Sequence, residues 1–178
     1  MAYIDFLSVT HKATQRDYLA RVNDPEYPKA KAAELAKQWG YDYWDGDRRI
    51  NYGGYHYDGR WLKVAKAMAE HYGLKPGDRV LDVGCGKGFL LYDFTQAVPG
   101  IEVAGIDISA YAIEHAKEEI RDVTQVVSAT NLPFPDNSFD LVYSINTLHN
   151  LKCHELDKAL REMQRVGKNN KYICVESY

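Results

Sequence analysis

The sequence predicts an α/β protein built around a doubly wound, mostly parallel sheet, and two observations lead to this prediction. Short apolar runs such as VAGI, LVYSI and YICV alternate with helix-forming segments from about residue 79 onwards. A glycine-rich turn, GCGKG, follows the first of the expected strands. Alternation of strand and helix indicates a parallel sheet with helices on both faces, and strands buried on both faces are nearly continuous apolar runs.

The first third of the chain differs from the rest. Residues 1–60 are polar, aromatic and helix-leaning, and we expect them to form an N-terminal segment ahead of the sheet in residues 61–178, within a single domain overall. PKAKAAELAKQWG predicts a helix, because Pro28 suits the first helical turn and Gly40 suits the end.

Residues 41–59 show no hydrophobic periodicity, and an aperiodic stretch of this length inside a compact domain is usually functional or disordered. Within it and just beyond it, NYGGYHYDGRW holds tyrosines, glycines, a histidine and a tryptophan but no aliphatic residue. RWLKVAKAMAEHYG then predicts a helix that ends at Gly73.

The remaining segments alternate between the two kinds of structure. In chain order the expected elements are strand RVLDVG, helix FLLYDFTQAV, strand IEVAGID, helix SAYAIEHAKEEIR, strand VTQVVSA, strand FDLVYSIN, helix HELDKALREMQRV and strand KYICVES. In such a sheet, ligands bind beyond the carboxyl ends of the strands.

The turn after the first strand places Gly84, Gly86 and Gly88 at alternate positions, which allows a ligand to approach the main chain closely. The following helix points its amide dipoles at the same place. A dinucleotide fingerprint requires a further glycine where Phe89 stands, so the match to that fingerprint fails.

Two carboxylates flank this turn. Asp82 lies where it would repel a pyrophosphate and suits a cationic group instead. Asp107 ends the second strand, where an acidic residue accepts hydrogen bonds from ribose hydroxyls. Together they indicate a nucleoside with a positively charged tail as ligand.

Three motifs in order, VLDVGCGKG, VAGIDIS and LPFPDNSFDLVYSINTLHNL, resemble the class I S-adenosylmethionine-dependent methyltransferases. The resemblance covers roughly residues 75–178 and is closest to the small-molecule branch that includes the ubiquinone/menaquinone-type enzymes. The alternative is an α/β domain that binds no nucleotide and has a glycine turn by chance.

The resemblance implies a Rossmann-like sheet with strand order 3-2-1-4-5, without the family's last two strands, and S-adenosylmethionine as cofactor, with S-adenosylhomocysteine as product. It implies that Asp82 faces the methionine amino group, Asp107 the ribose and Ile108 the adenine. Ser128 stands where the family commonly has an aspartate that accepts from the adenine amino group, which is a departure. The implied cofactor-binding residues are Asp82, Gly84, Cys85, Gly86, Asp107, Ile108, Ser128, Ala129, Thr130, Ser144 and Ile145.

The candidate catalytic residues are His149, Tyr52 and Tyr55. An oxygen or nitrogen acceptor needs a general base, and His149 follows the fourth strand; the alternative is a histidine that caps the next segment. Tyr52, Tyr55 and Tyr57 are expected in a lid over the cofactor, since a sulfonium methyl group favours aromatic faces; the alternative is an aromatic plug at the end of the sheet. Arg48 and Arg49 either bind an anionic acceptor or pair with nearby aspartates.

Composition limits the partners. The net charge of -3 disfavours nucleic acid, and no apolar run is long enough to cross a bilayer. Cys85, Cys153 and Cys174 are too few and scattered for a disulfide or zinc framework, which indicates a reduced, cytoplasmic protein without a metal site.

The function expected from this sequence is therefore methyl transfer to a small-molecule acceptor. The alternative functions are a cofactor-binding module without catalysis and a truncated form of a longer methyltransferase. The fifth strand would be an apolar open edge, which predicts truncation or coverage by a second copy or another chain, with a minimal five-stranded sheet as the alternative.

Overall fold

The protein is described here by a computed structural model, which covers residues 4–8, 10, 22 and 24–175. Much of the expected N-terminal segment and the last residues of the expected final strand lie outside the described residues. None of the helices in the described ranges combines the length and apolar composition needed to cross a bilayer.

Five strands form one sheet in the order β3-β2-β1-β4-β5, and every neighbouring pair is parallel. The predicted fold class and strand order are confirmed. The strands are β1 (Arg79–Val83), β2 (Glu102–Asp107), β3 (Thr124–Val126), β4 (Phe139–Ile145) and β5 (Gly167–Cys174).

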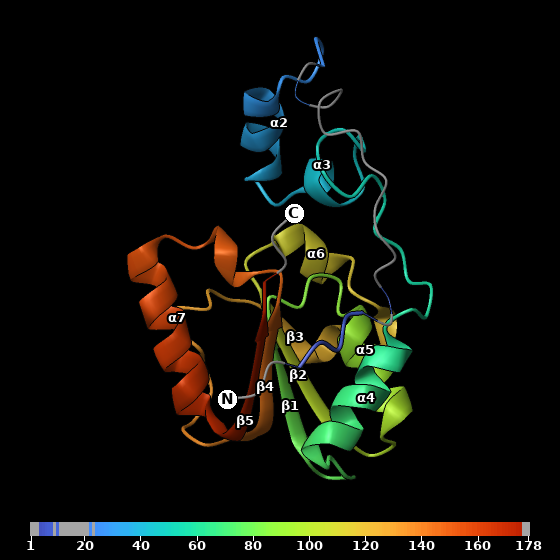
Figure 1. The fold of residues 1–178 in the computed structure, drawn as a ribbon, viewed down its shortest axis with the longest axis vertical. Helices are drawn as coiled ribbons and strands as arrows, with labels where there is room; N and C mark the ends of the chain where they lie inside the picture. The colour runs from blue at the N-terminus through green and yellow to red at the C-terminus, as the bar shows by residue number, and fades with distance from the viewer. Residues whose placement is uncertain (1–3, 9, 11–21, 23, 176–178) are drawn as a thin grey trace.

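Helices cover both faces of this sheet (Figure 1). α4 and α5 lie on one face and α7 on the other, while α2, α3 and α6 lie beyond one end of the strands. The helices are α2 (Lys29–Ala36), α3 (Tyr41–Trp44), α4 (Leu62–Tyr72), α5 (Phe89–Ala97), α6 (Ala110–Glu114), α7 (Cys153–Val166) and the 3₁₀ turns η1 (Glu118–Val123) and η2 (Leu148–Asn150).

Alternating side chains of the central strands build two separate cores, as the two-residue period of a strand requires. Val80 packs in the core beneath α4 and α5, whereas Leu81 and Val83 pack in the core beneath α7. The N-terminal residues Phe6 and Leu7 join the first core, and the ring of Phe6 lies 5.1 Å from that of Tyr172 on β5.

The expected continuous helix over residues 109–121 is wrong. α6 ends at Glu114, and the chain resumes as the 3₁₀ turn η1 at Glu118. Ser109 caps α6 by accepting a hydrogen bond from Ala112 N (3.0 Å). The helix stops because the backbone N–H of Lys117 donates to the carbonyl of Lys87 (3.0 Å), a long-range contact that hydrophobic periodicity does not reveal.

Candidate functional site

A cavity of about 880 Å³ opens at the carboxyl ends of the strands. It lies where a doubly wound sheet is expected to bind its ligand. Twelve sequence-predicted site residues line it: Tyr52, Tyr55, Asp82, Gly84, Cys85, Gly86, Asp107, Ile108, Ser128, Ala129, Ile145 and His149.

The two other candidates lie behind this lining. Thr130 Oγ1 is 2.9 Å from the hydroxyl oxygen of Ser128, so it contacts a cavity residue. Ser144 is buried, and its hydroxyl donates to the carbonyl of Val83 (2.7 Å). The side chain of Ser144 therefore joins the ends of β4 and β1.

The glycine turn is shaped by backbone angles that other residues rarely adopt. Gly84, Gly86 and Gly88 have φ angles of 93°, 53° and 72°. A Cβ atom on Gly84 would overlap the side chain of Thr147, so the loops after β1 and β4 pack in direct contact. The amides of Gly84 and Cys85 both donate to the carbonyl of Ile106 (2.8 and 2.9 Å), which joins the same turn to β2.

Asp107 lies at the centre of the site. One carboxylate oxygen accepts from Gly86 N and the other from Ser109 N, both at 2.8 Å. Burial raises the pKa of Asp107, although these amide hydrogen bonds act in the opposite direction. Each carboxylate oxygen has a further lone pair, so the group can also accept from hydroxyl groups of a ligand.

Asp82 faces the same cavity and is also buried. Burial raises its pKa to about 8, and the negative charge of Asp107 adds to the effect. A carboxylate in this environment lacks a compensating charge and is stabilised by a cationic ligand. Its chemistry therefore fits an ammonium group.

The far wall of the cavity is a segment that we call the aromatic cover, residues 41–59. The Trp44 ring lies against Gly86, where a Cβ atom would be only 2.7 Å from its Cη2. Its indole N–H donates to the hydroxyl of Ser109 (2.9 Å). Tyr52 stacks parallel to Trp44 at 5.3 Å, and the Tyr55 ring lies 4.7 Å from Tyr52.

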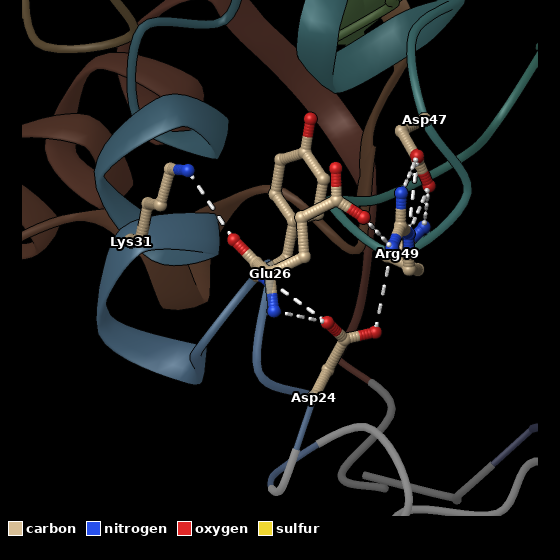
Figure 2. A network of polar contacts seen from close by, with 6 residues as sticks. Asp24, Glu26, Lys31, Asp47 and Arg49 are labelled. Carbon is tan, nitrogen blue, oxygen red and sulfur yellow. Dashed lines mark hydrogen bonds and ion pairs between the residues drawn. The ribbon is translucent and has the colours of Figure 1, made fainter.

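Ion pairs connect the aromatic cover to the chain that precedes it (Figure 2). Arg49 contacts Asp47 at 2.6 Å, Glu26 at 2.7 Å and Asp24 at 3.7 Å. Of the two alternatives for Arg49, the described residues thus show pairing with carboxylates. Arg48 lines the cavity and donates to the carbonyls of Asn51 and Tyr52 (3.0 and 2.5 Å).

His149 is exposed on η2 and lines the cavity together with Tyr52 and Tyr55, so the three candidate catalytic residues border one space. Sequence reasoning missed Trp44 and Thr147, both of which border that space. Trp44 lies in an aperiodic stretch, and only the many aromatic residues of that stretch could have indicated that Trp44 borders the site. Among the described residues, no cluster of side chains suits a metal ion.

Comparison with known proteins identifies the family. A family model described as a methyltransferase domain matches residues 81–175. A demethylmenaquinone methyltransferase of Symbiobacterium thermophilum is 34% identical over 128 residues, which cover 67% of this chain and 50% of that protein.

Two solved structures are similar as well. A putative methyltransferase from an antibiotic biosynthesis pathway of Anabaena variabilis superposes with a TM-score of 0.55 at 25% identity, covering 64% of this chain and 44% of that one. The [4+2]-cyclase SpnF superposes with a TM-score of 0.52 at 32% identity, covering 60% and 41%. The chain thus spans about half or less of the length of these relatives.

Proposed function

The chain belongs to the methyltransferase domain family, and from its site we propose that it transfers a methyl group from S-adenosylmethionine to a small-molecule acceptor. The observation that carries the proposal is the pair of buried carboxylates, Asp82 and Asp107, on either side of the glycine turn. The relative named as a methyltransferase favours catalysis over a binding module without catalysis.

The residues of the cavity fit this cofactor. Asp107 would accept hydrogen bonds from the ribose hydroxyls, and Asp82 would pair with the methionine ammonium group. Ile108 is 57% exposed beside Asp107, which leaves an apolar side chain available to pack on the adenine. Ser128 would offer its hydroxyl group to the adenine edge beside Ala129, and Thr130 would orient that hydroxyl from 2.9 Å without lining the cavity itself.

When bound, S-adenosylmethionine supplies an electrophilic methyl group. The chain's own contribution is then to exclude water, to hold the acceptor in line and to remove its proton. We assign proton removal to His149, and orientation of the acceptor to Tyr52 and Tyr55, because all three border the cavity.

Two measurements test the proposal. Calorimetric titration with S-adenosylhomocysteine should show one binding site per chain, and its absence would refute the cofactor assignment. Release of S-adenosylhomocysteine should then be followed over a panel of hydroxyl- and amine-bearing acceptors. Binding without turnover on any acceptor would leave a cofactor-binding module.

Two further features are proposed on separate grounds. We place the reaction in the cytoplasm because Cys85, Cys153 and Cys174 form no disulfide, as is usual for proteins of a reducing compartment. We propose that a second copy or another chain covers β5, because Ile173 and Val175 are 44% and 46% exposed on and beside this edge strand.

A further inference from the structure

A lysine inside the glycine turn has its side chain directed away from the cavity. Lys87 follows Gly86, yet it does not line the cavity, and it is only 4% exposed. A buried ammonium group is costly unless it is paired and hydrogen-bonded, so its partners should indicate its role.

The partners of Lys87 belong to the aromatic cover. Its Nζ lies 2.7 Å from both carboxylate oxygens of Asp45 and 3.0 Å from the carbonyl oxygen of Tyr55. All three donors of the ammonium group therefore have an acceptor. The side chains of Lys87 and Asp45 are 5% and 16% exposed, so the pair is shielded from salt and water.

Asp45 extends the contact to the second ligand-binding loop. Its carboxylate also accepts from Tyr55 N (3.1 Å) and from the hydroxyl of Tyr111 on α6 (2.8 Å). Burial acts to raise the pKa of Asp45, but the hydrogen bonds from Lys87 and Tyr111 outweigh it, and the pKa is lowered. One carboxylate thus joins the glycine turn, the aromatic cover and the helix that follows Asp107.

The ion pair between Lys87 and Asp45 is adjacent in the chain to the contact between Trp44 and Gly86. Trp44 precedes Asp45 and lies on Gly86, whose amide donates to Asp107. Lys87 follows Gly86, so the ion pair and the ring contact hold the same two segments together. Loss of the pair would leave Trp44 anchored at this turn only by its contact with Gly86 and its hydrogen bond to Ser109.

We propose that Lys87 is a positioning residue, which holds the aromatic cover over the cofactor site through Asp45 without touching the cofactor. The proposal rests on the proposed function for its effect on binding, but the contacts between Lys87 and the aromatic cover are made within the chain itself. Its first test can therefore be made on the ligand-free protein.

The test is hydrogen exchange in Lys87→Met, a variant that keeps the apolar stem and removes the charge. Exchange in residues 41–59 should become at least about tenfold faster, because one partner of a buried pair is left uncompensated. Exchange in β1 and β2 should stay unchanged. Lys66→Met, which removes the same charge from an exposed position on α4, should behave like the wild type.

Ligand binding gives the second readout. S-adenosylhomocysteine should slow exchange in residues 41–59 of the wild type, and it should dissociate roughly tenfold faster from Lys87→Met, because the cover no longer retains it. Lys87→Arg, which can still contact both oxygens of Asp45, should recover most of the slow dissociation. A purely structural lysine would show no such rescue.

Each outcome has a defined meaning. Unchanged exchange in residues 41–59 of Lys87→Met overturns the proposal. If this variant unfolds, Asp45→Asn replaces it, and global unfolding of both variants also overturns the proposal, because the pair would then maintain the whole fold. A wild type that does not bind S-adenosylhomocysteine, with faster exchange in Lys87→Met, refutes the proposed function and leaves the positioning role intact.

Discussion

The strand ends and the aromatic cover build opposite walls of one cavity, but by different means. At the strand ends, main-chain groups fix the geometry: the amides of Gly84 and Cys85 both donate to Ile106, and those of Gly86 and Ser109 donate to Asp107. The cover is held by side chains, chiefly Trp44, Asp45 and Tyr57, whose hydroxyl donates to Asp93 (2.6 Å).

This difference predicts how each wall responds to change. Substitutions in the main-chain contacts at the strand ends should lower the free energy of unfolding of the whole protein. Substitutions in the side-chain contacts of the aromatic cover should open that segment locally and leave the sheet folded.

The largest effect is expected for Gly84→Ala. Its φ of 93° disfavours a side chain, and the added Cβ would overlap Thr147, so the free energy of unfolding should fall by about 2–4 kcal/mol. Gly77→Ala is the matched control, because Gly77 has a φ of 86° with no atom near its Cβ position, and it should cost only about 1 kcal/mol. Urea denaturation measures both, and equal losses would contradict the packing argument.

The second prediction concerns Asp107→Ala, which should weaken S-adenosylhomocysteine binding by about one to two orders of magnitude. The variant would remove the charge-assisted hydrogen bonds that we propose between Asp107 and the ribose hydroxyls. It also removes the acceptor for the amides of Gly86 and Ser109. Glu102→Ala, at the exposed other end of β2, serves as control for calorimetry. Unchanged affinity in Asp107→Ala would rule out the ribose assignment.

These two walls also differ in how well the sequence predicted them. The strand ends were predicted because apolar runs, glycines and strand-terminal aspartates are local signals, and topology brings them together. The cover was predicted as an aromatic lid over the cofactor, with a plug at the end of the sheet as the alternative, but its individual contacts were not predicted. Its contacts from Asp45 to Lys87 and from Trp44 to Ser109 join residues 42 and 65 positions apart, and no local pattern encodes such pairs.

The interrupted helix after Ser109 has the same cause. The segment has helical periodicity, but the hydrogen bond from Lys117 N to the carbonyl of Lys87 ends it early. Local propensity lost to a tertiary contact there, as it often does. The unpredicted contact of Asp45 and the unpredicted end of this helix both involve Lys87, which binds Asp45 through its side chain and Lys117 through its carbonyl oxygen.

The third prediction concerns Asp82, whose pKa of about 8 lies above its ordinary value. The folded protein keeps this proton between roughly pH 4 and 8, whereas the unfolded chain loses it, so the contribution of Asp82 to stability falls as pH rises through this window. Asp82→Asn should therefore be more stable than the wild type at pH 8 by about 1–3 kcal/mol. Denaturant titrations from pH 5 to 8 give the difference between the two proteins.

Ligand binding should show the opposite trend. A cationic ligand pairs with the ionised carboxylate, so wild-type affinity for S-adenosylhomocysteine should rise as pH increases towards 8. Asp82→Asn should lose this dependence and bind more weakly throughout. A wild-type affinity that is constant from pH 6 to 8 would contradict pairing between Asp82 and the ligand ammonium group.

The smallest effect on stability is expected at the edge strand β5, which carries lysines near its start and an exposed isoleucine near its end. Lys168 and Lys171 lie among its first five residues, and lysines on an edge oppose pairing with another chain. The strand continues through the exposed Ile173 to its last residue, Cys174, and the exposed Val175 follows. Ile173→Lys should add a third lysine that opposes pairing of β5 with another chain. It should change the free energy of unfolding by no more than about 0.5 kcal/mol.

Its effect should instead appear in association. Light scattering after size-exclusion chromatography should give the wild type a mass that grows with concentration, and Ile173→Lys a mass closer to that of one chain. Leu160→Lys is the control, since Leu160 is an apolar side chain of similar exposure (40%) on α7, away from the backbone edge. If wild type and both variants have the mass of one chain at every concentration, no second copy covers β5. Equal loss of association in both variants would indicate a general apolar contact, because of the two residues only Ile173 lies on the edge strand.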